Sequence, residues 1–200
     1  MTAQQLYDTI KKYYPQCEVS SICYTSQSCR RYGFCADMQS GNVIDFDAIK
    51  DEMCKGQTLK PASVDAVCVS GTDHAFYFVE LKGWQRYIDN RYKQKLTPEE
   101  TALGYNLAGK LSASQRLCMQ IAADDNLFSK IPVRFLLVTD IDTQTNGIEA
   151  FHSLLNQLGQ SSTYIYSECL SQARRCLESE IFIDHDYVSC KDFTRFLNNE

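Results

Sequence analysis

Two apolar runs separated by a short turn constrain the fold of this chain more than any other feature. Residues 64–70 (VDAVCVS) and 75–82 (AFYFVELK) have the length and the β-branched and aromatic content of strands. Only residues 71–74 (GTDH) lie between them. A connection this short is typical of an antiparallel hairpin. We therefore expect a sheet that contains this hairpin.

A long amphipathic helix is expected after the hairpin, over residues 97–123. Thr97 is a suitable N-cap, Pro98 suits the first turn, and Glu100 completes a T-x-x-E capping box. One apolar stripe runs along the helix, formed by Leu103, Leu107, Leu111, Cys118 and Ile121.

The rest of the chain alternates between helix and strand patterns. Further helices are expected over residues 3–14, 44–53, 147–158, 168–178 and 191–198. Further strands are expected over residues 132–139, buried on both faces, and over 163–166 and 181–184. Residues 17–42 have the composition of a hairpin or an irregular region. The order of these elements predicts an α/β or α+β fold, with a mixed central β-sheet flanked by helices.

The composition is that of one globular unit. With 200 residues, 44% of them apolar, the chain can bury one substantial core, so we expect a single domain over residues 1–200. No apolar run approaches the roughly 20 residues that span a bilayer, and the first residues lack the layout of a secretory signal. We therefore expect a cytoplasmic protein without membrane contact. The net charge of −5 argues against a protein that coats nucleic acid non-specifically, but not against an enzyme with one local basic patch.

Four of the ten cysteines are evenly spaced near the N-terminus: Cys17, Cys23, Cys29 and Cys35. Four thiolates can hold zinc or an iron–sulfur cluster. Such sites usually contain a close pair such as C-x2-C, which this set lacks. We expect free thiols or a structural role here rather than a metal.

Charged residues stand at the ends of the hairpin strands. In a strand over 75–82, Glu80 and Lys82 lie on one face, about 6–7 Å apart at their Cα atoms. Asp65 begins the neighbouring strand, and an antiparallel hairpin puts the start of one strand beside the end of the other. Asp65 should therefore meet Glu80 and Lys82 across the pair.

Two carboxylates at one sheet end form a hard-oxygen site that suits Mg²⁺ or Mn²⁺. The backbone carbonyl of Leu81 is a further candidate ligand. The ammonium group of Lys82 could orient a water molecule or neutralise charge that develops on a phosphate. The plainer interpretation is that Asp65 caps a turn and that Glu80 and Lys82 form an ion pair at the rim of the sheet.

The combination of Asp65, fourteen residues, and Glu80-x-Lys82 on two hairpinned strands resembles the PD-(D/E)xK nuclease superfamily. The resemblance implies a restriction-endonuclease-like core in the order α-β-β-β-α-β over residues 44–140. Residues 1–43 would then be a cysteine-rich N-terminal extension, and residues 141–200 a C-terminal α/β extension. It also implies that Asp65 and Glu80 bind metal and that Lys82 is catalytic. Many members are Mg²⁺-dependent DNases, so we expect DNA rather than RNA as the partner, and many pair as homodimers.

Many members of this superfamily add an acid from the helix before the hairpin. In this sequence Glu52 is the first candidate for that additional metal ligand, with Asp47 and Asp51 as alternatives. The helix after the hairpin could supply substrate-positioning residues, for which Lys110, Ser114 and Gln115 are candidates.

A basic and aromatic stretch follows the motif directly. Between positions 82 and 95 there are five basic residues and one acid, with aromatic residues between them. This mixture suits phosphate contacts and base stacking, although it also fits a solvated face with aromatics packed beneath. The candidates for nucleic-acid binding are Trp84, Arg86, Arg91, Lys93, Lys95 and Lys110.

Two functions therefore follow from the sequence. The first is a metal-dependent nuclease that hydrolyses phosphodiester bonds through Asp65, Glu80 and Lys82. The second is a catalytically inactive binding protein with the same fold, such as an inhibitor, an immunity protein or a defence-associated partner of another protein.

Overall fold

Six strands of one mixed sheet form the centre of the described part of the chain, and their order across the sheet follows their order in the sequence. The computed structural model describes residues 1–26, 41–70, 74–82, 90, 93–139, 172, 175, 183–190 and 192–198. The strands are β1 (Glu18–Val19), β2 (Val43–Asp45), β3 (Ala66–Val69), β4 (Phe76–Lys82), β5 (Val133–Thr139) and β6 (Asp184–Ser189). The helices are α1 (Ala3–Tyr13), α3 (Phe46–Met53), α5 (Pro98–Leu103), α6 (Leu107–Ala122) and α9 (Phe193–Asn198), and 3-10 helices cover Pro15–Cys17, Ile22–Tyr24 and Leu127–Ser129.

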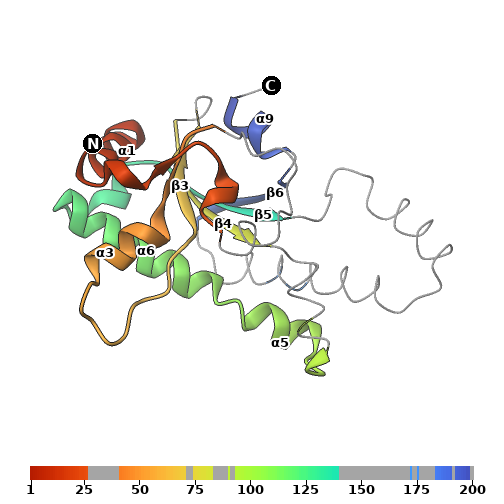
Figure 1. Cartoon of the computed structure of the whole chain (residues 1–200). Helices are drawn as coiled ribbons and strands as arrows, with labels where there is room; N and C mark the ends of the chain where they lie inside the picture. Colours follow the sequence, from red (N-terminus) through yellow and green to blue (C-terminus); the bar gives the residue numbers. More distant parts are fainter. Residues whose placement is uncertain are drawn as a thin grey trace.

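The sheet is antiparallel in its first half and parallel in its second. The pairs β1–β2, β2–β3 and β3–β4 are antiparallel, whereas β4–β5 and β5–β6 are parallel. A short connection joins β3 to β4, while the connection from β4 to β5 contains α5 and α6, as parallel pairing requires (Figure 1). The predicted mixed α/β class and the strands predicted over residues 64–70, 75–82 and 132–139 are confirmed.

Apolar cores lie on both faces of the sheet. On one face Phe78 of β4 packs in a cluster with Ile10 of α1 and Leu111 of α6. On the other face Tyr77 of β4 belongs to a cluster that includes Phe193 of α9. Figure 1 shows α1, α3 and α6 together on one side of the strands, apart from α9. Neighbouring residues of β4 therefore face different cores, and every second residue faces α6.

Strand β5 is buried on both faces, as its apolar run predicts. Phe135 and Leu137 belong to the core beneath α1 and α6, and Leu136 and Val138 belong to the opposite core. All four side chains are fully buried.

Both predicted helix starts with capping residues are confirmed. Thr2 Oγ1 accepts a hydrogen bond from the backbone N–H of Gln5 (3.2 Å), and Thr2 N–H donates to the Gln5 side chain (2.8 Å). Thr97 and Glu100 exchange the same two bonds, at 3.1 and 2.8 Å. These reciprocal bonds satisfy N–H groups that the first turn of a helix leaves without partners.

The prediction of a single helix over residues 97–123 is wrong. The segment forms α5 and α6, with a break at residues 104–106. Asn106 has a left-handed backbone (φ 54°), which a continuous α-helix does not contain. Leu103, expected on the buried stripe, is 51% exposed at the end of α5. The apolar stripe of α6 begins after the break, at Leu107, which is buried.

The helix predicted over residues 44–53 begins later than expected. Residues 43–45 form β2, and the helix α3 starts at Phe46. Asp45 is its N-cap, because its Oδ1 accepts a hydrogen bond from the backbone N–H of Ala48 (2.9 Å). The buried pattern of these three residues belongs to the sheet rather than to the helix.

The C-terminal predictions are tested only in part. The strand predicted over residues 181–184 lies later, as β6, and the helix predicted over residues 191–198 is present as α9. The elements predicted over 147–158 and 163–166 lie outside the described residues, and within 168–178 only Gln172 and Arg175 are described, both helical. In the described segments, no helix combines the length and the apolar character needed to cross a membrane.

Candidate active site

The β3–β4 hairpin brings Asp65 and Glu80 together. Its register pairs Ala66 with Val79, so the next pair outward is Asp65 and Glu80. The Oδ2 atom of Asp65 accepts a hydrogen bond from the backbone N–H of Leu81 (2.7 Å). The carboxylate of Asp65 is therefore fixed against the end of β4, next to Glu80.

Glu80 is a buried charged residue on the side of the sheet that α6 covers. It is 1% exposed and lies two residues after Phe78, on the same face of β4. Its Oε1 atom accepts a hydrogen bond from the hydroxyl of Tyr105 (2.8 Å) and another from the Nζ atom of Lys110. Its Oε2 atom is buried and has no hydrogen-bond partner among the described residues. One oxygen of this carboxylate is thus doubly bonded, and the other is left for a further partner.

Lys110 reaches Glu80 from the first turns of α6. Its Nζ atom also lies 4.9 Å from the centroid of the Tyr105 ring. Burial alone would lower the pKa of this ammonium group, but the charges of Glu80 and Asp65 outweigh burial and raise the pKa above its ordinary value. Lys110 is therefore charged at neutral pH and supplies one positive charge to the site.

Burial and the neighbouring carboxylate of Glu80 shift the pKa of Asp65. Burial, followed by the charge of Glu80, raises the pKa of Asp65 well above its ordinary value. Lys110 and the N–H of Leu81 act in the opposite direction, without cancelling the shift. Two carboxylates that repel each other in a buried site favour the binding of a cation, which would relieve the repulsion.

The acid that acts on this pair from the preceding helix is Asp47. The backbone N–H of Phe46 donates to the carbonyl oxygen of Asp65 (2.9 Å), which places the first turn of α3 beside Asp65. The charge of Asp47 contributes to the raised pKa of Asp65. Asp47 Oδ1 itself accepts hydrogen bonds from Lys50 (2.7 Å) and Ser63.

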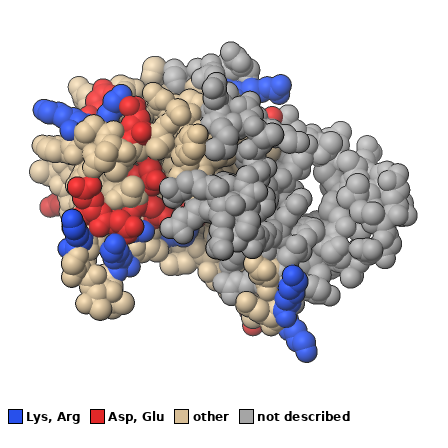
Figure 2. All heavy atoms as spheres, in the orientation of Figure 1, with Lys and Arg blue, Asp and Glu red and all other residues tan. Residues whose placement is uncertain are grey.

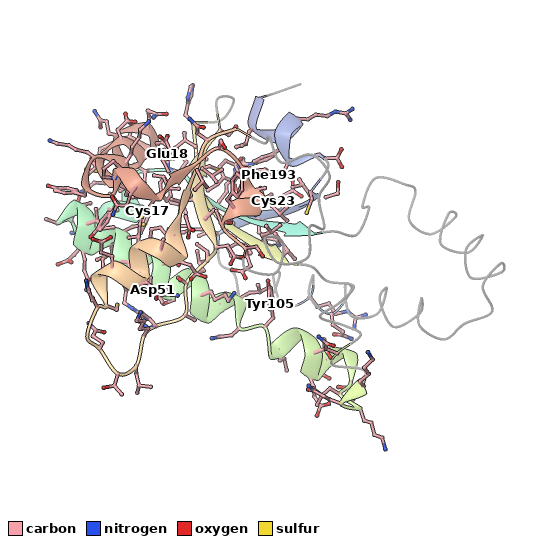
Figure 3. The ribbon with its side chains drawn as sticks, in the orientation of Figure 1. Cys17, Glu18, Cys23, Asp51, Tyr105 and Phe193 are labelled. Atoms are coloured by element: carbon pink, nitrogen blue, oxygen red, sulfur yellow. The ribbon has the colours of Figure 1, made fainter. Side chains whose placement is uncertain are left out.

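The structure does not place the first candidate for the additional acid, Glu52, with this pair. Glu52 lies near the end of α3, is exposed, and accepts a hydrogen bond from the side chain of Gln16 (2.8 Å). Asp51 is also directed away and pairs with Lys60 (2.9 Å). Figure 3 shows Asp51 on α3 and Tyr105 at the junction of α5 and α6 (Figure 3). The prediction of Glu52 as the additional acid is therefore not supported. The first turn of α3, which contains Asp47, lies beside Asp65, whereas Glu52 is in the last turn.

The candidates on α6 have different positions. Lys110 contacts Glu80, as described above. Ser114 is fully buried, and its Oγ atom accepts a hydrogen bond from the backbone N–H of Val64 (3.0 Å). Ser114 therefore holds the chain just before Asp65 instead of facing a substrate. Gln115 is half-buried.

The other predicted residues are placed only in part. Lys82 is the last residue of β4, two positions after Glu80, and its backbone is opposite Thr139 of β5. Lys93 and Lys95 are exposed. Three further candidates lie outside the described residues: Trp84, Arg86 and Arg91.

Tyr105 also belongs to the site, although it is not among the site residues predicted from the sequence. It is 4% exposed and bonds Glu80 directly. The signal that could have found it is local: Gly104 and Asn106, both poor helix formers, flank this tyrosine in the middle of the predicted helix.

Of the four N-terminal cysteines, the structure describes Cys17 and Cys23, and these two lie on opposite faces of the sheet. Cys17 belongs to the core beneath α1 and α6, and Cys23 belongs to the core on the opposite face of the sheet. Burial raises the pKa of the Cys17 thiol to about 11. Cys29 and Cys35 lie outside the described residues. Within the described segments, no group of three or more His, Cys, Asp or Glu residues is arranged to hold a metal ion.

The acid pair has the type of ligand atoms that a divalent cation prefers. Its two carboxylates are hard oxygen donors, and the buried Oε2 atom of Glu80 lacks a partner among the described residues. Figure 2 shows acidic side chains gathered over the face that carries α3, whose sequence includes Asp47, Asp51 and Glu52 (Figure 2). Asp47 and Asp51 form ion pairs with Lys50 and Lys60, so the negative charge of this surface is partly neutralised.

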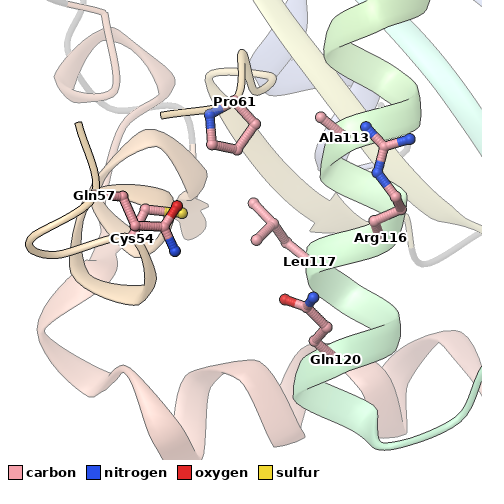
Figure 4. A pocket seen from close by; sticks show the side chains of 7 residues that line it. All are labelled: Cys54, Gln57, Pro61, Ala113, Arg116, Leu117 and Gln120. Carbon is pink, nitrogen blue, oxygen red and sulfur yellow. The ribbon is translucent and has the colours of Figure 1, made fainter. Parts of the chain in front are cut away.

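A separate pocket of about 190 Å³ lies between the connection after α3 and the helix α6 (Figure 4). Cys54, Pro61 and Leu117 contribute apolar surface, and Arg116 and Gln120 contribute polar groups. Neither carboxylate of the acid pair lines this pocket.

No family model, curated protein or solved structure matches the chain. The functional assignment therefore rests on the residues of this chain and on their geometry.

Proposed function

We propose that this protein is a metal-dependent nuclease of the PD-(D/E)xK type, which hydrolyses phosphodiester bonds in nucleic acid. The observation that carries the proposal is the placement of Asp65 beside the buried Glu80 at the end of a hairpin. Two ionisable acids are costly to bury together unless a cation joins them. The Oε2 atom of Glu80, which has no hydrogen-bond partner among the described residues, supports the same conclusion.

The order of the elements supports the proposal. The elements α1, β2, β3, β4, α6 and β5 follow the α-β-β-β-α-β order of the superfamily once β1, α3 and α5 are counted as additional elements. In this comparison the first helix is α1, which lies before residues 44–140, the core expected from the sequence. The first three strands of this series are antiparallel neighbours, and β5 is parallel to β4. Under this proposal Asp65 and Glu80-x-Lys82 would correspond to the motif positions of the family.

The residues have distinct roles in the proposed reaction. Asp65, Glu80 and the carbonyl oxygen of Leu81 would hold Mg²⁺ or Mn²⁺, which supplies Lewis-acid activation of water and of the phosphate. The N–H of Leu81 keeps Asp65 oriented. Lys82 provides the positive charge that stabilises the phosphate as charge develops on it.

The proposed substrate is DNA rather than RNA, held by the basic and aromatic stretch that follows Lys82. The exposed side chains of Lys93 and Lys95 are available for phosphate contacts. A local patch of this kind is compatible with the overall negative charge of the chain.

A second candidate function is a binding protein that retains the fold without catalysis. The observation that favours it is the contact of Glu80 with both Lys110 and Tyr105, which partly satisfies the carboxylate without any metal. Such a protein would bind a protein partner and would not hydrolyse nucleic acid.

Hydrolysis assays separate the two functions. Labelled single-stranded and double-stranded DNA and RNA are incubated with the purified protein in Mg²⁺, Mn²⁺ or chelator. The nuclease proposal expects cleavage that requires the metal and that identifies the substrate class. If a well-folded protein leaves all four substrates intact in both metals, the binding-protein function replaces it.

A further inference from the structure

Lys110 occupies the position of a counter-ion within the acid pair. It extends from α6 to β4, and its Nζ atom bonds the Oε1 atom of Glu80. Its side chain is 21% exposed, while that of Glu80 is 1% exposed. The ammonium group therefore reaches the buried carboxylate from the more solvated side of the site.

The single positive charge of Lys110 neutralises only part of the negative charge of the carboxylates at the site. The negative charges of Glu80 and Asp65 act most strongly on Lys110. Asp47 also acts on Lys110, more weakly, and has its own ion pair with Lys50 at 2.7 Å. One ammonium group thus serves two carboxylates. A divalent cation on the same carboxylates would be repelled by this ammonium group at short range, because two positive charges would share Glu80.

We propose that Lys110 is an internal cation that competes with the divalent metal for Glu80, so that metal binding loosens the Lys110–Glu80 ion pair. This inference rests on the proposed metal site. It assigns to Lys110 a control of metal affinity, which differs from the substrate contact expected from the sequence. A purely structural ion pair would behave differently, because removing the lysine would then leave the metal affinity unchanged or weaken it.

Glu80 has two hydrogen-bond donors, Tyr105 and Lys110, so Lys110 can be replaced while Glu80 keeps one of them. The hydroxyl of Tyr105 donates to Oε1 independently of Lys110, so we expect this bond to remain when Lys110 is replaced. Lys110→Met keeps the apolar stem and removes the charge. Lys110→Gln removes the charge but retains a hydrogen-bond donor, and it keeps the test decisive if the methionine variant folds poorly.

The experiment measures metal binding directly. Mn²⁺ binding is followed by electron paramagnetic resonance of the free ion, and Mg²⁺ binding by calorimetry, at fixed pH and ionic strength and without nucleic acid. The proteins are the wild type, both Lys110 variants, Glu80→Gln, and the double variant Lys110→Met with Glu80→Gln. Lys130→Gln is the matched control, because it removes the same charge from an exposed ion pair with Asp124. Circular dichroism verifies folding.

We expect both Lys110 variants to bind Mn²⁺ about tenfold more tightly than the wild type, or better, because a nearby positive charge has been removed. Lys130→Gln should bind Mn²⁺ with the affinity of the wild type. The double variant should not show the increase in Mn²⁺ affinity, because it lacks the carboxylate of Glu80. Folded Lys110 variants that bind no more tightly than the wild type would overturn the inference, while a Glu80-dependent wild-type site would leave the proposed function standing. If Glu80→Gln binds the metal as the wild type does, or if no variant binds it, the proposed metal site fails together with the inference.

Discussion

The carboxylate of Asp65 accepts a hydrogen bond from the backbone N–H of Leu81, with 2.7 Å between Oδ2 and N. The bond joins the residue just before β3 to the end of β4, so the register of the hairpin sets the position of this acid. Glu80 precedes Leu81 and faces the side of the sheet that α6 covers. The two acids are therefore held close together by the hairpin, which is the preorganisation that the proposed metal site would require.

Asp65→Asn should stabilise the metal-free protein at neutral pH. The pKa of Asp65 is raised in the folded state, so the protein favours the protonated form of this group. The stability associated with that form is fully present below the ordinary carboxyl pKa and is lost as pH rises through the raised value. Asparagine has no charge to bury and still offers an oxygen to the N–H of Leu81.

Urea unfolding in chelator at pH 4, 6 and 8 measures this effect. The free energy of unfolding of Asp65→Asn should exceed that of the wild type at pH 8, and the difference should shrink toward pH 4. Asp125→Asn, at an exposed position, is the control and should change little at any pH. A variant less stable than the wild type at pH 8 would show that Asp65 is not an uncompensated charge.

Tyr105→Phe should destabilise the fold by about 1–2 kcal/mol, because a buried hydroxyl that donates to Glu80 is lost and the ring is kept. Chemical denaturation at neutral pH measures the change. Tyr13→Phe is a matched control, since Tyr13 is 64% exposed and should stay within about 0.5 kcal/mol of the wild type. Equal effects of the two substitutions would contradict the role of Tyr105 in supporting Glu80.

Ser114→Ala should cost about 1–3 kcal/mol, because it leaves the buried N–H of Val64 without its acceptor. The comparison is Ser112→Ala on the same helix, where the serine is exposed and bonds Arg116 (3.1 Å). Thermal unfolding of the two variants provides the measurement. No loss of stability in Ser114→Ala would mean that water or another group replaces the serine oxygen.

The strands of the candidate site could be predicted because burial on both faces leaves a simple pattern. The run 132–139 is continuously apolar, and β5 is buried on both sides. The two runs around residues 71–74 fix an antiparallel register, and that register places Asp65 by Glu80. In this hairpin, a local sequence pattern was sufficient to bring together two residues fifteen positions apart.

The acid contributed by the preceding helix could not be chosen from the sequence. Asp47 and Glu52 both lie on α3, and only the position of β2 decides which end of the helix meets Asp65. Strand β2 has three residues and merges directly into α3 at Asp45, so no change of periodicity separates them. Residues 43–45 form a strand because they pair with β3, which is a long-range contact that the local sequence does not show.

The helix break was missed for a related reason. Leu103, Leu107 and Leu111 repeat at four-residue intervals, as in one continuous helix. The fold instead ends α5 and begins α6 after Asn106, and Tyr105 between them is buried against Glu80. The tertiary contact of Tyr105 overrides the local pattern at this position.

The central claim is tested most directly by nucleic-acid cleavage in the wild type and in Lys82→Ala, with Mg²⁺, Mn²⁺ or chelator. Lys130→Ala serves as the control for loss of one positive charge, and circular dichroism verifies that all three proteins are folded. We expect metal-dependent cleavage by the wild type and the control. Lys82→Ala should lose at least a hundredfold, the scale typical of a group that stabilises transition-state charge. Full metal-dependent activity in Lys82→Ala would contradict the roles assigned to the motif, and no cleavage by the folded wild type would contradict the nuclease itself.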